Sequence, residues 1–151
     1  MLDDLDRRLL RLLQADPTLT VPEIADRAEL SAGKTSRRLD RLRAEGILVG
    51  QEAIIDWNAL GFEVKVSLRV SLEKTEPRAF DDFIEGARKV PEVIEVQTFL
   101  GRVDVRLHIV ARDLGHWQKI YRDRVLTLPH IADIEALMTV ATVKSEEELP
   151  L

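Results

Sequence analysis

A regular alternation of apolar and polar residues over positions 62–72 constrains the fold more than any other feature of this sequence. Every second residue is apolar, and the residues between them are charged or carry hydroxyl groups. A period of two places the apolar set on one side of a β-strand and the polar set on the other. The sequence therefore predicts a half-buried strand in a sheet with one covered face. The apolar set is Phe62, Val64, Val66, Leu68, Val70 and Leu72.

The residues after this strand are predicted to form the remaining helices and strands of the same domain. We expect a helix from Glu76-Pro77 to Ala87, strands at 93–100 and 103–111, a helix capped by Asp113, and a last strand at 131–143. The order β-α-β-β-α-β is typical of a ferredoxin-like domain, whose antiparallel sheet packs one face on both helices. A charged tail is expected at 145–148.

The second face of that sheet has no covering element in the chain. We therefore expect it to expose strand residues such as Val66 and Val70, and to be covered by a partner. A second copy of the chain would satisfy this requirement.

The first fifty residues indicate three short helices. Asp3 or Asp4, Thr20 and Ser31 are suitable N-caps, and Glu45-Gly46 is a suitable end for the third helix. A short capped helix, a tight connection and a basic amphipathic helix form a helix-turn-helix. Residues 47–55 contain two short β-prone runs, which predict either the wing of a winged helix or a connecting hairpin. The chain is thus predicted to be α+β, with domains at 1–60 and 61–151.

The charge of the chain is uneven although its net value is −5. Residues 1–50 carry nine basic and nine acidic side chains, whereas Ser31–Arg43 holds five basic residues against Asp40 alone. One basic element on an acidic body is typical of a protein that contacts a polyanion through a small surface. The alternative from charge alone is a solvated helix face with internal salt bridges.

The third predicted helix is the candidate DNA-recognition helix. Lys34, Arg37 and Arg41 lie opposite the apolar side formed by Leu39 and Leu42. Residues early in such a helix approach base edges, while Arg38 and Arg41 suit phosphate contacts. The predicted DNA-binding residues are Ser31, Ala32, Gly33, Lys34, Thr35, Arg37, Arg38 and Arg41.

The sequence offers little support for catalysis. There is no cysteine, so thiol nucleophiles, disulfides and thiolate metal sites are excluded. The three histidines show no metal-ligand spacing, and neither a phosphate-binding glycine loop nor a nucleophile elbow is present. We expect no enzyme activity, no cofactor and no metal. The acidic N-terminus and the lack of a long apolar run predict a cytoplasmic protein without membrane contact.

The residues Gly101 to Asp104 form the second candidate site. A glycine between two strands is often only a hairpin turn. Asp104 nevertheless interrupts an apolar strand start beside a glycine with free backbone groups, and its carboxylate suits the ammonium group of a small amino-acid ligand.

Motifs distributed over nearly the whole chain resemble those of the Lrp/AsnC (leucine-responsive, or feast/famine) regulators. The order and spacing of these motifs carry the resemblance, more than any one of them. They are Leu5-Asp6-Arg7-Arg8-Leu9-Leu10 with Leu13-Gln14, Leu30-Ser31, Arg38-Leu39 with Leu42, Glu45-Gly46-Ile47-Leu48, Leu60-Gly61, Val90-Pro91-Glu92-Val93, Gly101 with Asp104, and Leu128-Pro129.

The resemblance implies a winged helix-turn-helix joined to an amino-acid-sensing ferredoxin-like domain, called the RAM domain. It also implies a homodimer, with dimers assembling into octamers, and an effector site between dimers. The corresponding residues here are Leu100, Gly101, Arg102 and Asp104, with Glu135 and Ala136 at the last strand.

These observations together predict a sequence-specific transcriptional regulator that binds double-stranded DNA and responds to an amino acid or a related metabolite. The main alternative is an amino-acid-binding allosteric module or subunit of a metabolic enzyme. The basic helix at 31–43 distinguishes the two, because an allosteric module does not require positive charge there. A passive oligomerisation protein is a further alternative, which effector binding at Gly101 and Asp104 would exclude.

Overall fold

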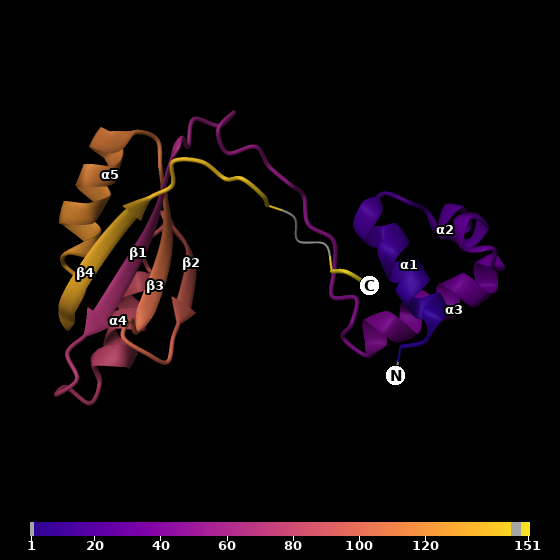
Figure 1. Ribbon diagram of the computed structural model, residues 1–151, viewed down its shortest axis with the longest axis horizontal. Helices are drawn as coiled ribbons and strands as arrows, with labels where there is room; N and C mark the ends of the chain where they lie inside the picture. The colour runs from indigo at the N-terminus through magenta and orange to yellow at the C-terminus, as the bar shows by residue number, and fades with distance from the viewer. Residues whose placement is uncertain (1, 146–148) are drawn as a thin grey trace. The chain divides into compact units, whose positions relative to one another are not determined.

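The computed structural model describes residues 2–145 and 149–151, which form two compact units (Figure 1). The first unit comprises the described residues up to Ile54 and those from Lys144 onward, and the second comprises Ile55–Val143. This division assigns residues 55–60 to the second unit and the C-terminal segment to the first, unlike the predicted limits of 1–60 and 61–151. Residues 146–148 of the predicted charged tail lie outside the described residues.

Three helices build the first unit, and each begins at a residue that the sequence marks as a cap. In α1 (Asp4–Ala15) Asp3 accepts a hydrogen bond from the backbone N–H of Asp6, at 2.8 Å. In α2 (Val21–Ala28) the Glu23 carboxylate accepts from the backbone N–H of Thr20, at 2.8 Å. In α3 (Ala32–Ala44) Ser31 accepts from the backbone N–H of Lys34, at 3.3 Å. The predicted starts of all three helices are confirmed.

The turns around α3 depend on two residues with positive φ. Glu29 ends α2 with φ 58°, a left-handed conformation that non-glycine residues rarely adopt. Gly46 follows α3 with φ 68°, as expected for a glycine that terminates a helix. These two turns allow the helices to pack around one small core. The buried side chains of that core are Leu9, Ile24, Ala28, Leu39 and Leu42.

Residues 47–55 contain no strand, which corrects the predicted β-prone runs of a wing or connecting hairpin. Leu48 packs against the core of the first unit, whereas Val49 and Ile54 are exposed. Without a second strand to accept its backbone hydrogen bonds, β-propensity alone does not hold this segment in a ladder.

The second unit has the predicted β-α-β-β-α-β order. Its elements are β1 (Val64–Leu72), α4 (Ala79–Ala87), β2 (Val93–Thr98), β3 (Val105–Ala111), α5 (Leu114–Ile120) continued by the π-helical turn η1 (Tyr121–Val125), and β4 (Ile131–Met138). The strands are ordered β2-β3-β1-β4 and all neighbouring pairs are antiparallel. The predicted cap of α5 is confirmed, since Asp113 accepts from the backbone N–H of His116 at 2.7 Å.

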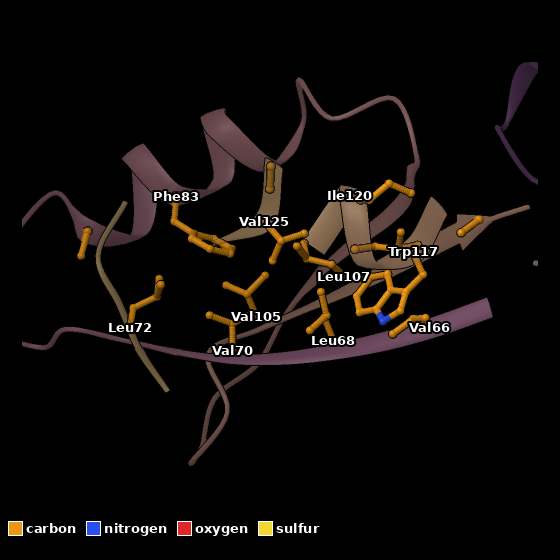
Figure 2. Packing of buried hydrophobic residues seen from close by; sticks show 14 residues of the cluster. Val66, Leu68, Val70, Leu72, Phe83, Val105, Leu107, Trp117, Ile120 and Val125 are labelled. Carbon is orange, nitrogen blue, oxygen red and sulfur yellow. The ribbon is translucent and has the colours of Figure 1, made fainter. Parts of the chain in front are cut away.

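Both helices of this unit cover the same face of the sheet. Phe83 of α4 and Trp117 of α5 pack with Val66, Leu68 and Val70 of β1 in one buried cluster (Figure 2). Val66 and Val70 are fully buried there, so their predicted place on the uncovered face is wrong. Strand alternation supplies only one apolar face, and the helices cover it.

The opposite face of the sheet is mainly polar, although Val110 and Leu137 also lie on it. Across it, Arg69 of β1 is paired in register with Arg106 of β3 and Glu135 of β4, and Ser67 is paired with His108. The Arg69 and Glu135 side chains form an ion pair at 3.6 Å. A partner that covers this face must therefore match charges and hydrogen bonds as well as shape.

Candidate functional sites

The outer surface of α3 forms the first candidate site. Ser31, Ala32, Gly33, Lys34 and Arg37 are all exposed, whereas Leu39 and Leu42 on the other side are buried in the core. Within the described part of the chain, the Lys34 and Arg37 side chains have no ion-pair partner. Two cationic groups are thus presented to solvent from the first half of the helix.

The buried carboxylate of Asp6 attaches α1 to α3. The Asp6 side chain is 1% exposed and pairs with Arg38 through Oδ1, at 2.7 Å, and with Arg41 through Oδ2. Asp3 contacts the same Arg38 guanidinium at 2.7 Å. The backbone N–H of Asp6 and the Arg38 guanidinium lower the pKa of Asp3 to about 2. Two arginines compensate for burial of this carboxylate, so the network fixes the orientation of α3.

Two of the predicted DNA-binding residues are less accessible than Lys34 and Arg37. The Arg38 guanidinium is directed to Asp3 and Asp6 and its side chain is only 19% exposed, so within the chain it joins α3 to α1, and its phosphate contact stays a prediction. Thr35 is fully buried and its hydroxyl has no hydrogen-bond partner among the described residues, so its side chain faces the core of the first unit. The Arg41 side chain is 45% exposed and its guanidinium pairs with Asp6. Part of this side chain therefore remains accessible for the predicted phosphate contact.

Sequence reasoning missed Asp6, although a signal for it exists. Asp6, Leu9 and Leu13 follow a spacing of three and four residues, which places an acid on the apolar side of α1. A charge in that position predicts a buried partner, and the basic residues of α3 supply one.

The connection between β2 and β3 forms the second candidate site. Gly101 has φ 153°, a conformation that residues with a side chain rarely adopt, and Leu100 beside it is fully exposed. The Ser71 hydroxyl donates to the carbonyl of Arg102 at 2.9 Å, which fastens the connection to β1. Glycine is required here by the backbone turn itself.

Asp104 follows this turn and its carboxylate is 14% exposed. Oδ2 accepts from the backbone N–H of Leu72 at 2.8 Å, and Oδ1 forms an ion pair with Lys74 Nζ. The Lys74 ammonium, followed by the Leu72 N–H, lowers the pKa of Asp104. The carboxylate is therefore ionised and already holds one primary ammonium group.

The structure does not bring Glu135 and Ala136 to this turn within one chain. Both lie on β4, which is separated from β3 by β1, so about 10 Å divide the two strands. Glu135 faces the polar side of the sheet, and Ala136, paired in register with Leu68, faces the side of the helices. Adjacent strand residues point to opposite faces, so within one chain only Glu135 lies on the polar side, and the predicted effector role of both residues stays a prediction.

Within residues 2–145 and 149–151, no three histidine, aspartate or glutamate side chains are grouped as a metal site requires. None of the helices in the described part of the chain has the length and apolar character needed to cross a bilayer.

Together the two units define a class of protein: a helix-turn-helix domain with a basic outer helix, followed by a ferredoxin-like domain. Family models match both parts, namely "Winged helix-turn-helix DNA-binding" over residues 2–49 and "Lrp/AsnC ligand binding domain" over residues 65–149. The chain belongs to the Lrp/AsnC family of transcriptional regulators.

Several known proteins are similar to this chain over nearly its full length. The HTH-type transcriptional regulator Zrp of Zymomonas mobilis is 32% identical, with 99% of this chain and 97% of that protein covered. The transcriptional activator DecR of Escherichia coli is 26% identical, covering 100% and 99%. The crystal structure of a transcriptional regulator from Neisseria meningitidis, a complex with L-methionine, has a TM-score of 0.92 at 27% identity, covering 99% and 97%.

The predictions of family and fold class are confirmed by these matches. The relatives are regulators rather than enzymes, so the alternative of an allosteric enzyme subunit is set aside.

Proposed function

We propose that this regulator binds double-stranded DNA through the first half of α3, in the cytoplasm, with Lys34 and Arg37 as its main contacts. The observation that carries the proposal is the exposure of these two cations on a helix whose opposite side is anchored by leucines and by Asp6. Ser31, Ala32 and Gly33 lie in the same first turn, where small side chains permit close approach to a duplex.

Selection of bound genomic fragments by the purified protein tests this proposal. On a selected site, Arg37→Ala is expected to weaken binding by about 1–3 kcal/mol and to relax the preference at one position, because a bidentate contact to guanine is lost. Arg43→Ala, which removes the same charge from the last turn of α3, is the matched control. Unchanged binding by both Arg37→Ala and Lys34→Ala would place the interface elsewhere.

We further propose that the ferredoxin-like domain binds an amino acid as effector, with the ammonium group at Asp104. Support comes from the ionised carboxylate beside the Gly101 turn and from the L-methionine complex of the Neisseria regulator. In this proposal residues 1–60 are the DNA-binding domain and residues 61–151 the effector domain. A thermal-shift screen of the twenty amino acids, on the wild type and on Asp104→Ala, tests it.

We propose that the active form is a homodimer, with octamers as a higher state. Support comes from apolar side chains that a single chain leaves exposed in extended segments, among them Ile54 and Val140. Such surface is unfavourable in water and is removed when a second copy covers it.

A further inference from the structure

Lys74 lies in the turn between β1 and α4, and its ammonium group contacts Asp104. Asp104 has two carboxylate oxygens, of which one accepts from the Leu72 N–H and the other from Lys74. The Lys74 side chain is 68% exposed, whereas that of Asp104 is 14% exposed. The carboxylate is thus held in place by the backbone, while its cation reaches it from an exposed side chain.

We propose that Lys74 occupies the ammonium position of the effector site and determines which ligands enter it. The inference rests on the proposed effector role of Asp104. A ligand ammonium and the Lys74 ammonium have the same charge, so their repulsion disfavours both at one carboxylate although each oxygen has two lone pairs. In the proposed exchange Lys74 leaves Oδ1 when the ligand binds.

The displaced Lys74 needs a new partner, and an α-amino acid supplies one. Its carboxylate is attached to the same carbon as its ammonium group, so both ends of the ion pair are exchanged: the ligand ammonium pairs with Asp104 and Lys74 pairs with the ligand carboxylate. An amine or an amino-acid amide offers no such carboxylate and leaves Lys74 unpaired. Lys74 therefore selects zwitterionic α-amino acids over other primary amines.

The geometry around the pair permits this exchange. The Leu72 N–H fixes Asp104 at 2.8 Å, and the Ser71–Arg102 hydrogen bond at 2.9 Å holds the turn, both independently of Lys74. An ion pair with so exposed a partner contributes little to stability, so breaking it costs little. Lys74 moves while the rest of the site stays in place.

Calorimetric binding of all twenty L-amino acids, and of the C-terminal amide of each one that binds, tests the proposal. The wild type is expected to bind the acid more tightly than the amide. In Lys74→Gln this preference should shrink by about 1.4- to fivefold, the range measured for exposed ion pairs, and Lys74→Arg should restore it. Lys89→Gln is the matched control, since Lys89 is 71% exposed and is paired with Glu85 on α4.

Three outcomes would contradict the proposal. An acid-to-amide ratio that is the same in wild type and Lys74→Gln overturns it and leaves the effector role of Asp104 intact. Equal weakening of both ligands, with a lower melting temperature, shows that Lys74 only stabilises the turn. Failure of every amino acid to bind wild type and variants overturns the proposed effector role, and this inference with it.

Discussion

At the scale of single residues, Asp6 determines how α3 is presented. Its carboxylate is buried and binds Arg38 and Arg41, and Arg38 retains Asp3 as a second partner. Asp6→Ala is expected to lower the free energy of unfolding by about 2–4 kcal/mol, because hydrogen bonds to charged groups are lost. Urea unfolding measures this loss. Asp4→Ala, at an exposed position of the same turn, should change stability by less than about 0.5 kcal/mol, and an equal effect of both variants would contradict the role of Asp6.

Acid should weaken the same network through Asp3. The pKa of Asp3 is lowered from 3.8 to about 2 in the folded chain, so folding favours its ionised form. A carboxylate with a lowered pKa stabilises the fold above the unfolded value, and this contribution is lost as pH falls from about 4 to about 2.

Asp3→Asn, which keeps a capping side chain, should therefore flatten the decline of stability between pH 4 and pH 2. Urea midpoints at several pH values measure it, with Asp4→Asn as the control for charge. Identical pH profiles of Asp3→Asn and wild type would show that ionisation of Asp3 adds nothing to stability.

At the scale of elements, local signals predicted most of the fold. Helix caps and glycine stops depend on neighbouring residues, and a period of two identifies a strand without knowledge of its partners. The face that each strand buries depends on where the helices pack, so Val66 and Val70 were assigned to the wrong side. Residues 47–55 have strand propensity but lack a partner strand in the chain, which the sequence could not indicate.

The candidate sites were predictable to the extent that they are local. The exposed first turn of α3 follows from helical spacing, and the Gly101 turn follows from its position between strands. The ion pairs of Arg38 are made with Asp6 and Asp3, which lie more than thirty residues away in the sequence. Asp104 is paired with Lys74, thirty residues away. Contacts between residues so far apart in the sequence leave no periodic pattern from which they could be predicted.

The turn between α2 and α3 offers a test at this scale. Glu29 has φ 58°, and its ion pair with Arg8, at 3.6 Å, involves a side chain that is 82% exposed. Glu29→Gly should stabilise the helix-turn-helix by about 0.5–1 kcal/mol, because glycine adopts this conformation without strain and an exposed ion pair contributes little. Urea unfolding measures the gain, and Asp26→Gly, inside α2, should destabilise by about 1 kcal/mol. A loss of stability in Glu29→Gly would show that the Arg8 contact outweighs the strain.

At the scale of the whole molecule, DNA binding and effector binding are assigned to units with separate cores. Variants at α3 should therefore impair DNA binding without altering the binding of an amino acid. If the effector alters DNA affinity, a coupling free energy of about 1–3 kcal/mol between the two proposed functions is usual for such systems.

The proposed homodimer predicts that the whole chain self-associates in solution. The segment after β4 exposes Val140 and Val143 almost completely, at 100% and 98%, although a monomer gains nothing from apolar side chains in such positions. Light scattering of the wild type should give a mass of at least twice 17.2 kDa at micromolar concentration.

Val140→Lys should shift this mass toward the monomer, because a charge would be buried in place of a methyl-bearing side chain when a second copy covers the segment. Gln118→Lys adds the same charge on α5, at an exposed polar position outside this segment, and should leave the mass higher than that of Val140→Lys. Circular dichroism verifies that both variants keep their helices and sheet. A wild-type mass of 17.2 kDa at micromolar concentration would contradict the homodimer, and equal masses for the two variants would show that the exposed valines do not lie in its interface.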